Sequence, residues 1–218
     1  MSISLSQFES QGLVESVSST DDRVWAVSVK GRIVLDYYKN HCLHLVMTSG
    51  LVAAAFRGLR RNRCTVADLV PGFTALQWML RKEFIFSPET SCSGFVARGL
   101  NELAEYGALK HSDGIYELAD ITRISELYSL FRSVLEAYWI VLITIAKTPR
   151  SKSDTIKALH GSVETLISEG TISRPEAITD INLKNAIRTF QEDGVLTVDA
   201  QGRLNVSQTD LEAVMSWL

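Results

Sequence analysis

One stretch, residues 31–63, constrains the fold more than any other part of the chain. Its small and apolar residues recur at alternating steps of three and four: Tyr38, His41 or Cys42, Leu45, Ser49, Val52, Phe56 and Leu59. Residues at this spacing share one side of an α-helix, because the helix completes a turn every 3.6 residues. The stretch therefore predicts a long helix with one buried face, in which Gly50 and Gly58 favour a break or kink.

The composition is that of a folded protein with no strongly basic partner surface. Of 218 residues, 46% are hydrophobic and 22% charged, which excludes wholesale disorder and allows one domain or two of about 100 residues. The net charge of −3 argues against nucleic acid as a partner of the whole chain. Three cysteines without a Cys-x-x-Cys pair predict neither disulfides nor zinc, and fit a reducing, intracellular compartment.

The rest of the chain reads as helices interrupted by two hairpins. Residues 1–22 are polar and Ser-rich, which predicts a frayed or linking arm, and a short strand is expected near Trp25. Further helices are expected at residues 65–86 (interrupted at Pro71), 93–106, 124–146, 153–169, 181–193 and 209–218. Asp113-Gly114 and Gln201-Gly202 are typical turn dipeptides, so hairpins are expected over residues 110–118 and 195–206.

Both hairpins follow a glycine placed to end a helix, Gly107 and Gly194. Three helices and a hairpin thus occur twice. The sequence predicts a mainly α fold with small β-hairpins: a polar N-terminal arm (1–22) and two tandem, winged-helix-like units (23–120 and 121–218). Two unrelated helical segments with similar ends are the alternative.

Winged-helix units often bind DNA, so the charge of the third helix of each unit is informative. In the first unit that helix carries one cation, Arg98, against two glutamates, and in the second Lys184 and Arg188 face two acidic residues. A helix in the major groove must neutralise phosphates and reach base edges. Nucleic acid is therefore an unlikely partner, and a tandem winged-helix adaptor or regulator binding nucleic acid or protein is the alternative function.

The densest basic cluster consists of Arg57, Arg60, Arg61 and Arg63. One interpretation is that these cations complement the dipole at the end of a helix and are otherwise solvated. The other is that they contact anionic lipid headgroups or an acidic partner domain. They are the candidate partner- or membrane-contact residues, and both interpretations stay open at this point.

The histidines give no sign of a metal or catalytic site. His41 and His44 lie three apart, but no third ligand follows on that helix face, so partly buried, hydrogen-bonded rings are expected. His111 and His160 have no visible partner. Nucleophile-elbow, Walker and dinucleotide motifs are absent from the sequence. We expect no catalytic residue, no metal and no cofactor in this chain.

Three stretches resemble a known family. They are residues 32–44, with Leu-Asp-Tyr-Tyr-Lys-Asn at 35–40; residues 130–139, ending in the pair Tyr138-Trp139; and residues 183–196. In this order they resemble the region C-terminal to the catalytic domain of glycerol-3-phosphate and dihydroxyacetone-phosphate acyltransferases. The resemblance extends from about residue 23 to the end of the chain.

The resemblance implies a parent enzyme of phospholipid or ether-lipid synthesis that works at a membrane. Such enzymes transfer a fatty acyl group from acyl-CoA or acyl carrier protein and use a His-x-x-x-x-Asp motif as general base. No histidine here has Asp five residues later, so the catalytic domain is missing and the chain is expected to be inactive alone. Glu169-Gly-Thr-Ile-Ser-Arg174 is similar to a related acceptor motif, but Ile172 replaces an Arg and Gly170 is expected simply to end a helix.

The expected function is thus that of an accessory domain that packs on the catalytic domain, in cis or in trans, and stabilises it. Peripheral contact with an anionic membrane is a further expectation, as is an intracellular location, membrane-associated through the parent enzyme. The longest apolar run, residues 137–146, is shorter than the roughly 20 residues that a spanning helix needs, so we do not expect the chain to cross the membrane itself.

Overall fold

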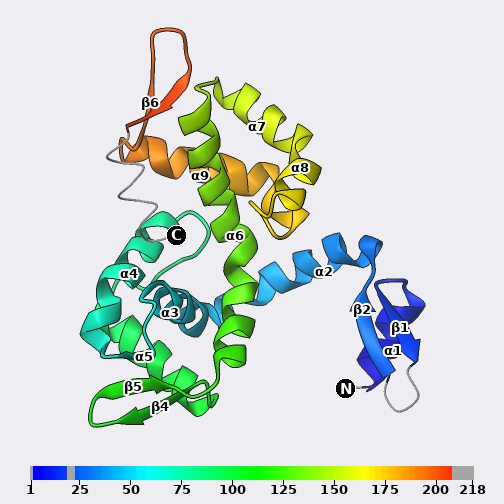
Figure 1. The fold of residues 1–218 in the computed structure, drawn as a ribbon, viewed down its shortest axis with the longest axis vertical. Coiled ribbons are helices and arrows are strands. Elements are labelled where there is room, and N and C mark those ends of the chain that lie inside the picture. Colours follow the sequence, from blue (N-terminus) through cyan, green and yellow to red (C-terminus); the bar gives the residue numbers. More distant parts are fainter. Residues whose placement is uncertain (1, 19–22, 208–218) are drawn as a thin grey trace. The chain divides into compact units, whose positions relative to one another are not determined.

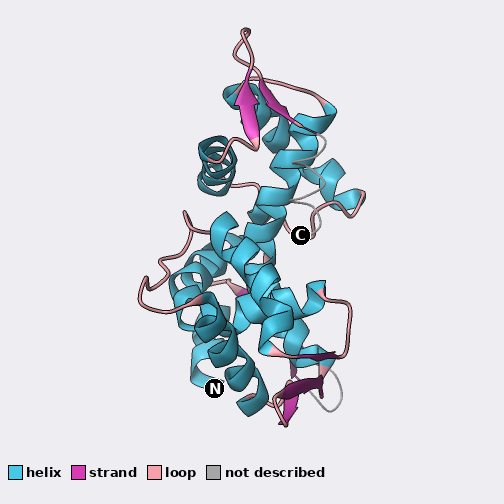
Figure 2. Cartoon of the chain, turned by 90° about the vertical axis from the view of Figure 1, so that its left-hand side faces the viewer, coloured by secondary structure: helices cyan, strands magenta, loops and turns pink. Residues whose placement is uncertain are grey.

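The computed structural model describes residues 2–18 and 23–207. It is mainly helical with short antiparallel strands, which confirms the predicted fold class at this level (Figures 1 and 2). The winged-helix detail and the division of the chain near residue 120 stay predictions. By its contacts the chain forms two compact units, unit 1 (Met1–Leu45) and unit 2 (Val46–Leu218). The expected closing helix at 209–218 lies outside the described residues.

Unit 1 contains a hairpin between two helices. Its elements are α1 (Ser2–Ser10), β1 (Val14–Ser18), β2 (Arg23–Val27), α2 (Val29–Cys42) and the 3₁₀ turn η1 (Leu43–Leu45). Val14 lies opposite Val27 in the antiparallel ladder. The expectation of a frayed arm is therefore wrong for residues 2–18, because Leu13 and Val14 are buried and the strand's backbone pairs with β2.

The start of α2 is fixed against the turn that precedes β1. The Ser28 hydroxyl caps the helix by accepting a hydrogen bond from the Gly31 N–H at 2.9 Å, and it donates to the Gly12 carbonyl at 2.6 Å. A Cβ on Gly31 would lie 1.8 Å from the Leu13 carbonyl oxygen. Only glycine fits this close approach of two backbone segments.

The predicted helix over residues 31–63 is divided into α2, η1 and α3 (Met47–Gly58). The second half of its predicted face is buried as expected: Ser49, Val52 and Phe56. The first half is not, since Tyr38 and Leu45 are 58% and 73% exposed. The break lies at residues 43–46 and not at Gly50. Gly50 instead lets α3 pack closely on α6, since a Cβ at residue 50 would lie 2.0 Å from the Phe131 ring.

Unit 2 is organised around one long helix, α6, which contacts α3 along one part and α7, α9 and the turn η2 along another (Figure 1). Its elements after α3 are β3 (Arg63–Cys64), α4 (Val66–Met79), α5 (Cys92–Glu105), β4 (Leu109–Ser112), β5 (Ile115–Leu118), α6 (Ile121–Lys147), α7 (Lys152–Gly161), α8 (Val163–Ser168), η2 (Pro175–Ala177), α9 (Asp180–Glu192), β6 (Leu196–Val198) and β7 (Leu204–Val206). Strands β3, β5 and β4 form one sheet in that order, and β6 and β7 form another.

Several local signals of the sequence are confirmed. Thr65 and Asp68 form the two hydrogen bonds of a capping box at the start of α4. Gly107 and Gly194 have positive φ angles of 77° and 73° at the ends of α5 and α9. Both hairpins form, and Asp113 is left-handed at φ 51° in the first turn.

Three details of the predicted helices are wrong. The helix expected over residues 65–86 ends at Met79, and residues 84–86 have no regular secondary structure. α4 continues through Pro71, because the proline removes a single backbone donor near the first turns and the apolar face (Leu69, Phe73, Leu76) remains buried on both sides of it. The helix expected over residues 153–169 is capped by Ser151 and is divided into α7 and α8 at Ser162.

The core of unit 2 is tightly packed around α6. Phe131 and Tyr138 on α6 are fully buried, and the Tyr138 ring meets Phe190 of α9 edge to face at 5.7 Å. Between α3 and α5, a Cβ on Gly99 would lie 2.6 Å from Val52. The interior of unit 2 is thus packed closely enough that one added or removed methyl group is expected to change its stability.

Candidate functional site

Two of the four candidate arginines make side-chain contacts with other residues of unit 2. The Arg57 guanidinium donates to the Ser125 hydroxyl at 2.8 Å and lies 4.7 Å from the centre of the Tyr128 ring. Arg63 pairs with Glu117 of β5 at 2.9 Å. Both side chains are occupied within unit 2, so they fit the structural interpretation of the cluster better than a binding one.

Arg60 and Arg61 occupy the turn after α3 and are exposed. Arg60 has a left-handed backbone, with φ of 52°. The pKa of the Asp68 carboxyl is lowered, chiefly by its hydrogen bonds from Thr65 and to a smaller extent by the charge of Arg61. Whether these two side chains contact a membrane or a partner stays a prediction.

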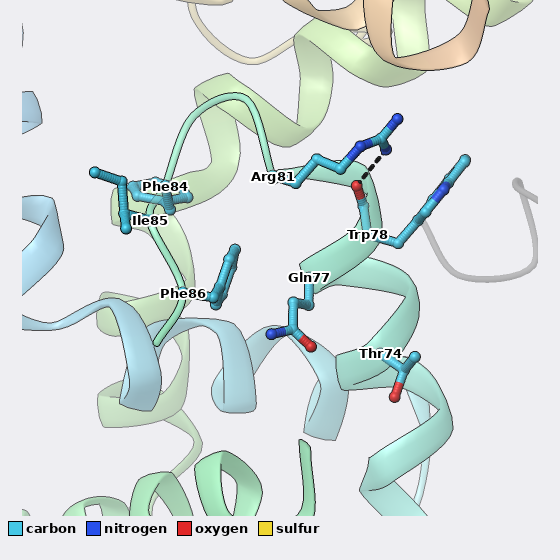
Figure 3. Close-up of a pocket in the computed structure, with 7 residues that line it drawn as sticks. All are labelled: Thr74, Gln77, Trp78, Arg81, Phe84, Ile85 and Phe86. Atoms are coloured by element: carbon cyan, nitrogen blue, oxygen red, sulfur yellow. Dashed lines mark hydrogen bonds between the residues drawn. The ribbon is translucent and has the colours of Figure 1, made fainter. Parts of the chain in front are cut away.

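A cavity of about 500 Å³ lies beside the end of α4 (Figure 3). It is lined by Thr74, Gln77, Trp78, Arg81, Phe84, Ile85 and Phe86. The aromatic residues and Ile85 come from the end of α4 and the loop after it, and Ile85 is 97% exposed. Arg81 is the one ionisable residue in this lining, so the cavity is suited to apolar contact and not to acid–base chemistry.

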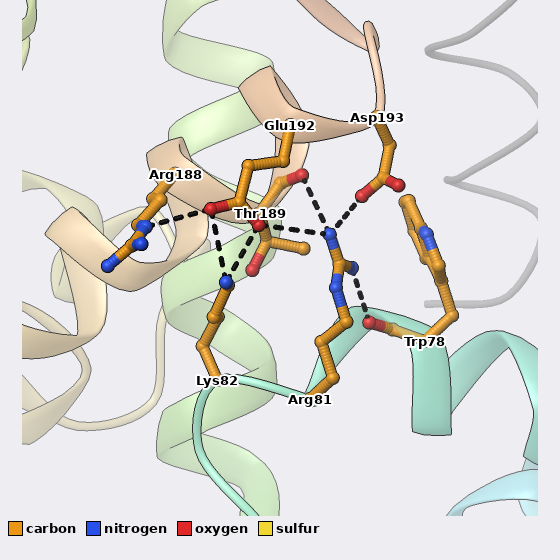
Figure 4. A network of polar contacts seen from close by, with 7 residues as sticks. All are labelled: Trp78, Arg81, Lys82, Arg188, Thr189, Glu192 and Asp193. Carbon is orange, nitrogen blue, oxygen red and sulfur yellow. Dashed lines mark hydrogen bonds and ion pairs between the residues drawn. The ribbon is translucent and has the colours of Figure 1, made fainter.

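Arg81 itself belongs to a network of ion pairs between the end of α4 and the end of α9 (Figure 4). It pairs with Asp193, and Lys82 pairs with Glu192 at 2.7 Å. Arg188 also donates to Glu192, at 2.8 Å. The hydrogen bonds from Lys82 and then from Arg188 lower the pKa of the Glu192 carboxyl. These residues stabilise the contact of two helices and leave no cation free for a ligand.

Two largely buried carboxylates have structural partners as well. Tyr138 donates its hydroxyl proton to Glu83 at 3.2 Å, and burial raises the pKa of Glu83. Glu136 accepts the Ser173 N–H at 3.0 Å and pairs with Arg132 at 2.7 Å. Neither carboxylate lines a described cavity, so neither is placed to act on a substrate.

The segment similar to an acyl-acceptor motif is part of the fold. Gly170 has a φ of +70° at the end of α8, Ile172 is buried and the Ser173 N–H is bound to Glu136. The expectation that Gly170 simply ends a helix is confirmed. Ile172 and the Ser173 backbone are therefore used by the fold, whereas the Glu169 side chain is exposed.

A second cavity, about 550 Å³ in volume, lies between α7 and α9. We call it the α7–α9 groove. It is lined by Lys152, Ser153, Ile156, Lys157, His160, Asp180 and Lys184. The Asp180 carboxylate bonds to His160 Nε2 at 2.8 Å and to Lys184 Nζ at 2.7 Å, and the hydrogen bonds from Lys184 and then His160 lower its pKa. The expectation that His160 has no partner is therefore wrong.

The other histidines and the cysteines are placed as structural or surface residues. His111 stacks on Tyr116 with ring centres 4.2 Å apart, whereas it was expected to have no partner. His41 and His44 are exposed, so the expectation of partly buried rings is wrong. Among the described residues, no group of three or more potential ligands is arranged to hold a metal.

The cysteines form no disulfide. All three are free, and burial raises the pKa of the Cys64 thiol to about 11. A thiol with so high a pKa is a poor nucleophile at neutral pH.

In the part of the chain that the structure describes, α6 is the one helix long and apolar enough to cross a membrane by length and composition. Of its most apolar window, 56% is buried inside the fold. Core helices of globular domains pass the same test.

Comparison with known proteins identifies the family. Residues 2–199 match the family described as the C-terminal region of glycerol-3-phosphate acyltransferase. Over 206 residues the chain is 26% identical to a glycerol-3-phosphate acyltransferase from Pseudoalteromonas atlantica, an alignment that covers 86% of this chain and 24% of the relative. The chain thus spans about a quarter of the length of that relative. By the extent of the family match, the chain belongs to the family of glycerol-3-phosphate acyltransferase C-terminal regions.

Proposed function

We propose that the chain is a non-catalytic accessory region of a glycerol-3-phosphate acyltransferase that packs on the catalytic domain and stabilises it. Through that enzyme it serves phospholipid or ether-lipid synthesis and associates with a membrane. Family membership supports the parent enzyme. The described cavities support the non-catalytic role, because Arg81 is the one ionisable residue that lines the cavity beside α4, and in the α7–α9 groove His160 is bonded to Asp180 and no hydrogen bond joins it to the Ser153 hydroxyl.

The observation that carries the proposal is the open apolar face of α2. Val34, Tyr38 and Leu45 are 37%, 58% and 73% exposed. Val34 and Tyr38 are spaced by four residues and share one side of α2, and Leu45 follows in η1, the 3₁₀ turn directly after it. An apolar stripe of this kind is typical of a surface that another element covers.

The small core of unit 1 adds a second argument. Its described apolar side chains that are buried are Leu13, Val14 and Leu43. Unit 1 has 45 residues, and chains this short seldom bury enough apolar surface to fold alone. On its hairpin and the start of α2, Val24, Val27 and Val29 are exposed too. Unit 1 would therefore gain stability from a covering partner.

The catalytic domain is the occupant that best fits this face. The family match describes a C-terminal region, and 76% of the Pseudoalteromonas relative lies outside the aligned part. Two domains joined in one polypeptide lose little translational entropy when they pack together, so an apolar face of modest area is sufficient to hold them in contact.

The test is binding in trans. The purified chain is titrated with the separately expressed catalytic part of the acyltransferase, and a complex with micromolar or tighter affinity is expected by calorimetry. Tyr38→Ser with Leu45→Ser should weaken it at least tenfold. The matched control, Ile115→Ser with Val198→Ser, removes two exposed apolar residues of unit 2 and should leave the affinity unchanged.

Three outcomes would contradict the proposal. The absence of a complex at micromolar concentrations would remove the accessory role. Equal weakening by both double variants would show that the contact does not involve α2. The isolated chain is expected to transfer no acyl group, and acyl transfer that Glu169→Gln abolishes would also overturn a non-catalytic role.

A further inference from the structure

The segment from the end of α6 into α7 carries cations that form no ion pair with an acidic residue among the described residues. They are Lys147, Arg150, Lys152 and Lys157. The one acidic residue among positions 147–161, Asp154, accepts the Ser151 hydroxyl at 2.7 Å in the helix cap. The charge of this segment is therefore not neutralised locally, in contrast to that of Arg63, which pairs with Glu117.

Two of these cations line the α7–α9 groove. Lys152 and Lys157 are exposed, and they border the groove on the α7 side together with Ser153 and His160. Lys184 borders it from α9. Ile156, buried below the exposed lysines, contributes an apolar part of the lining. The groove thus has an apolar patch and a cationic rim contributed by two helices.

The single carboxylate in the groove does not cancel this charge. Asp180 is bonded to both Lys184 and His160, so its negative charge is shared by two donors of the same groove. The formal charge of the lining is +2 with His160 neutral, from Lys152, Lys157 and Lys184 against Asp180. The excess charge belongs to Lys152 and Lys157.

We propose that the α7–α9 groove binds a phosphate group. Two lysine ammonium groups provide several N–H donors, and phosphate is the biological group that best combines a charge of up to −2 with several strong acceptor oxygens. The Ser153 hydroxyl and His160 are further polar groups at the rim. The volume of about 550 Å³ exceeds that of one phosphate, so the groove has room for a small group that carries the phosphate. Its source is a soluble phosphate or the headgroup of an anionic lipid, and the experiment separates the two.

The experiment uses the full chain and two probes. Inorganic phosphate is titrated at constant ionic strength against chloride while the imidazole and α7 amide signals are followed by NMR. Vesicles of phosphatidylglycerol are compared with vesicles of phosphatidylcholine by co-sedimentation. A saturable shift with phosphate supports the proposal with a soluble ligand. Binding to phosphatidylglycerol vesicles, without a response to inorganic phosphate or to phosphatidylcholine vesicles, supports the proposal with a lipid headgroup as the ligand.

Variants locate the site. Lys152→Ala with Lys157→Ala should weaken binding about fivefold per lysine, or roughly 25-fold together, at the usual contribution of one surface cation. Asp180→Asn should strengthen binding, because it releases Lys184 and removes the competing carboxylate. Lys30→Ala with Lys110→Ala removes two exposed cations outside the groove and outside the cluster after α3, so it is the control of equal charge and should leave the affinity within twofold.

Three results would overturn the proposal: no saturable response to either probe, undiminished binding by the Lys152→Ala, Lys157→Ala variant, or equal weakening by the Lys30→Ala, Lys110→Ala control. The last would mean that net charge and not the groove is responsible. All the substituted residues are exposed, and unchanged NMR dispersion verifies that the variants are folded.

Discussion

The two units of the chain differ in what they do with apolar side chains. Unit 2 buries large side chains completely, among them Phe131, Tyr138 and Phe190. Of the thirteen large apolar side chains that are exposed among the described residues, six lie in the 45 residues of unit 1. Burial of apolar surface is the main source of stability. Unit 2 therefore has the means to be stable by itself, whereas unit 1 leaves much of its apolar surface exposed, as the proposed contact with the catalytic domain requires.

The largest expected effect tests the core of unit 2. Phe190 is fully buried and its ring lies 5.7 Å from that of Tyr138 and 6.1 Å from that of Trp78. Phe190→Ala should lower the free energy of unfolding by about 3–5 kcal/mol, because it leaves a cavity among rings that cannot all close on it. Urea unfolding followed by circular dichroism measures the change. A loss below about 1 kcal/mol would mean that unit 2 is not tightly packed here.

A pair of glycines in α3 gives a second test of the packing in unit 2, with a smaller expected change in the free energy of unfolding. Gly50→Ala places a methyl group against the Phe131 ring and should cost about 1–3 kcal/mol of unfolding free energy. Gly58→Ala, in the last turn of the same helix, meets no atom within 4 Å. It should stabilise the chain by up to about 1 kcal/mol through the lower entropy of the unfolded state. Equal effects of the two substitutions would contradict close packing of α3 on α6.

Glu83 gives a pH-dependent prediction. Burial raises its pKa above the value of 4.5 that the unfolded chain would have, so its contribution to stability is full below pH 4.5 and is lost as the pH rises through the folded-state pKa. Glu83→Gln keeps an acceptor for the Tyr138 hydroxyl and removes the buried charge. It should stabilise the chain modestly at pH 7 and change little at pH 4. Thermal unfolding at both pH values checks this, and destabilisation at pH 7 would contradict it.

The smallest effect on stability is expected in unit 1. Tyr38→Ser with Leu45→Ser removes two exposed side chains, and the free chain should keep its unfolding free energy within about 0.5 kcal/mol. A loss above about 1 kcal/mol in urea would contradict the contrast between the units. It would mean that unit 2 of the same chain already covers the face assigned to the catalytic domain.

Local structure was predictable where it depends on one or two residues that are close in the sequence. The capping box of Thr65 and Asp68, the helix-ending Gly107 and Gly194, and the Asp113-Gly114 turn all formed as expected, because each depends on neighbours in sequence. The buried second half of the face over residues 31–63 followed from its periodicity as well.

What the sequence did not reveal depends on distant partners. The break at residues 43–46 has no glycine or proline to mark it, and α1 and β1 are rich in serine and other polar residues that usually indicate a loop. His160 and Asp180 are twenty residues apart and meet only because α7 packs beside α9. The α7–α9 groove was missed for the same reason, since its lysines are scattered in sequence while the arginines after α3 are adjacent. A dense run of charge was the more visible signal, yet the structure uses half of that run internally.

The single helix α6 also sets a length scale. Its 27 residues extend over roughly 40 Å at 1.5 Å per residue, and both groups of shorter helices in unit 2 are anchored to it. A continuous helix packed on both sides resists bending. Unit 2 would consequently act as a spacer of fixed length, so that whatever binds beside α7 is held at a constant distance from whatever touches the turn after α3.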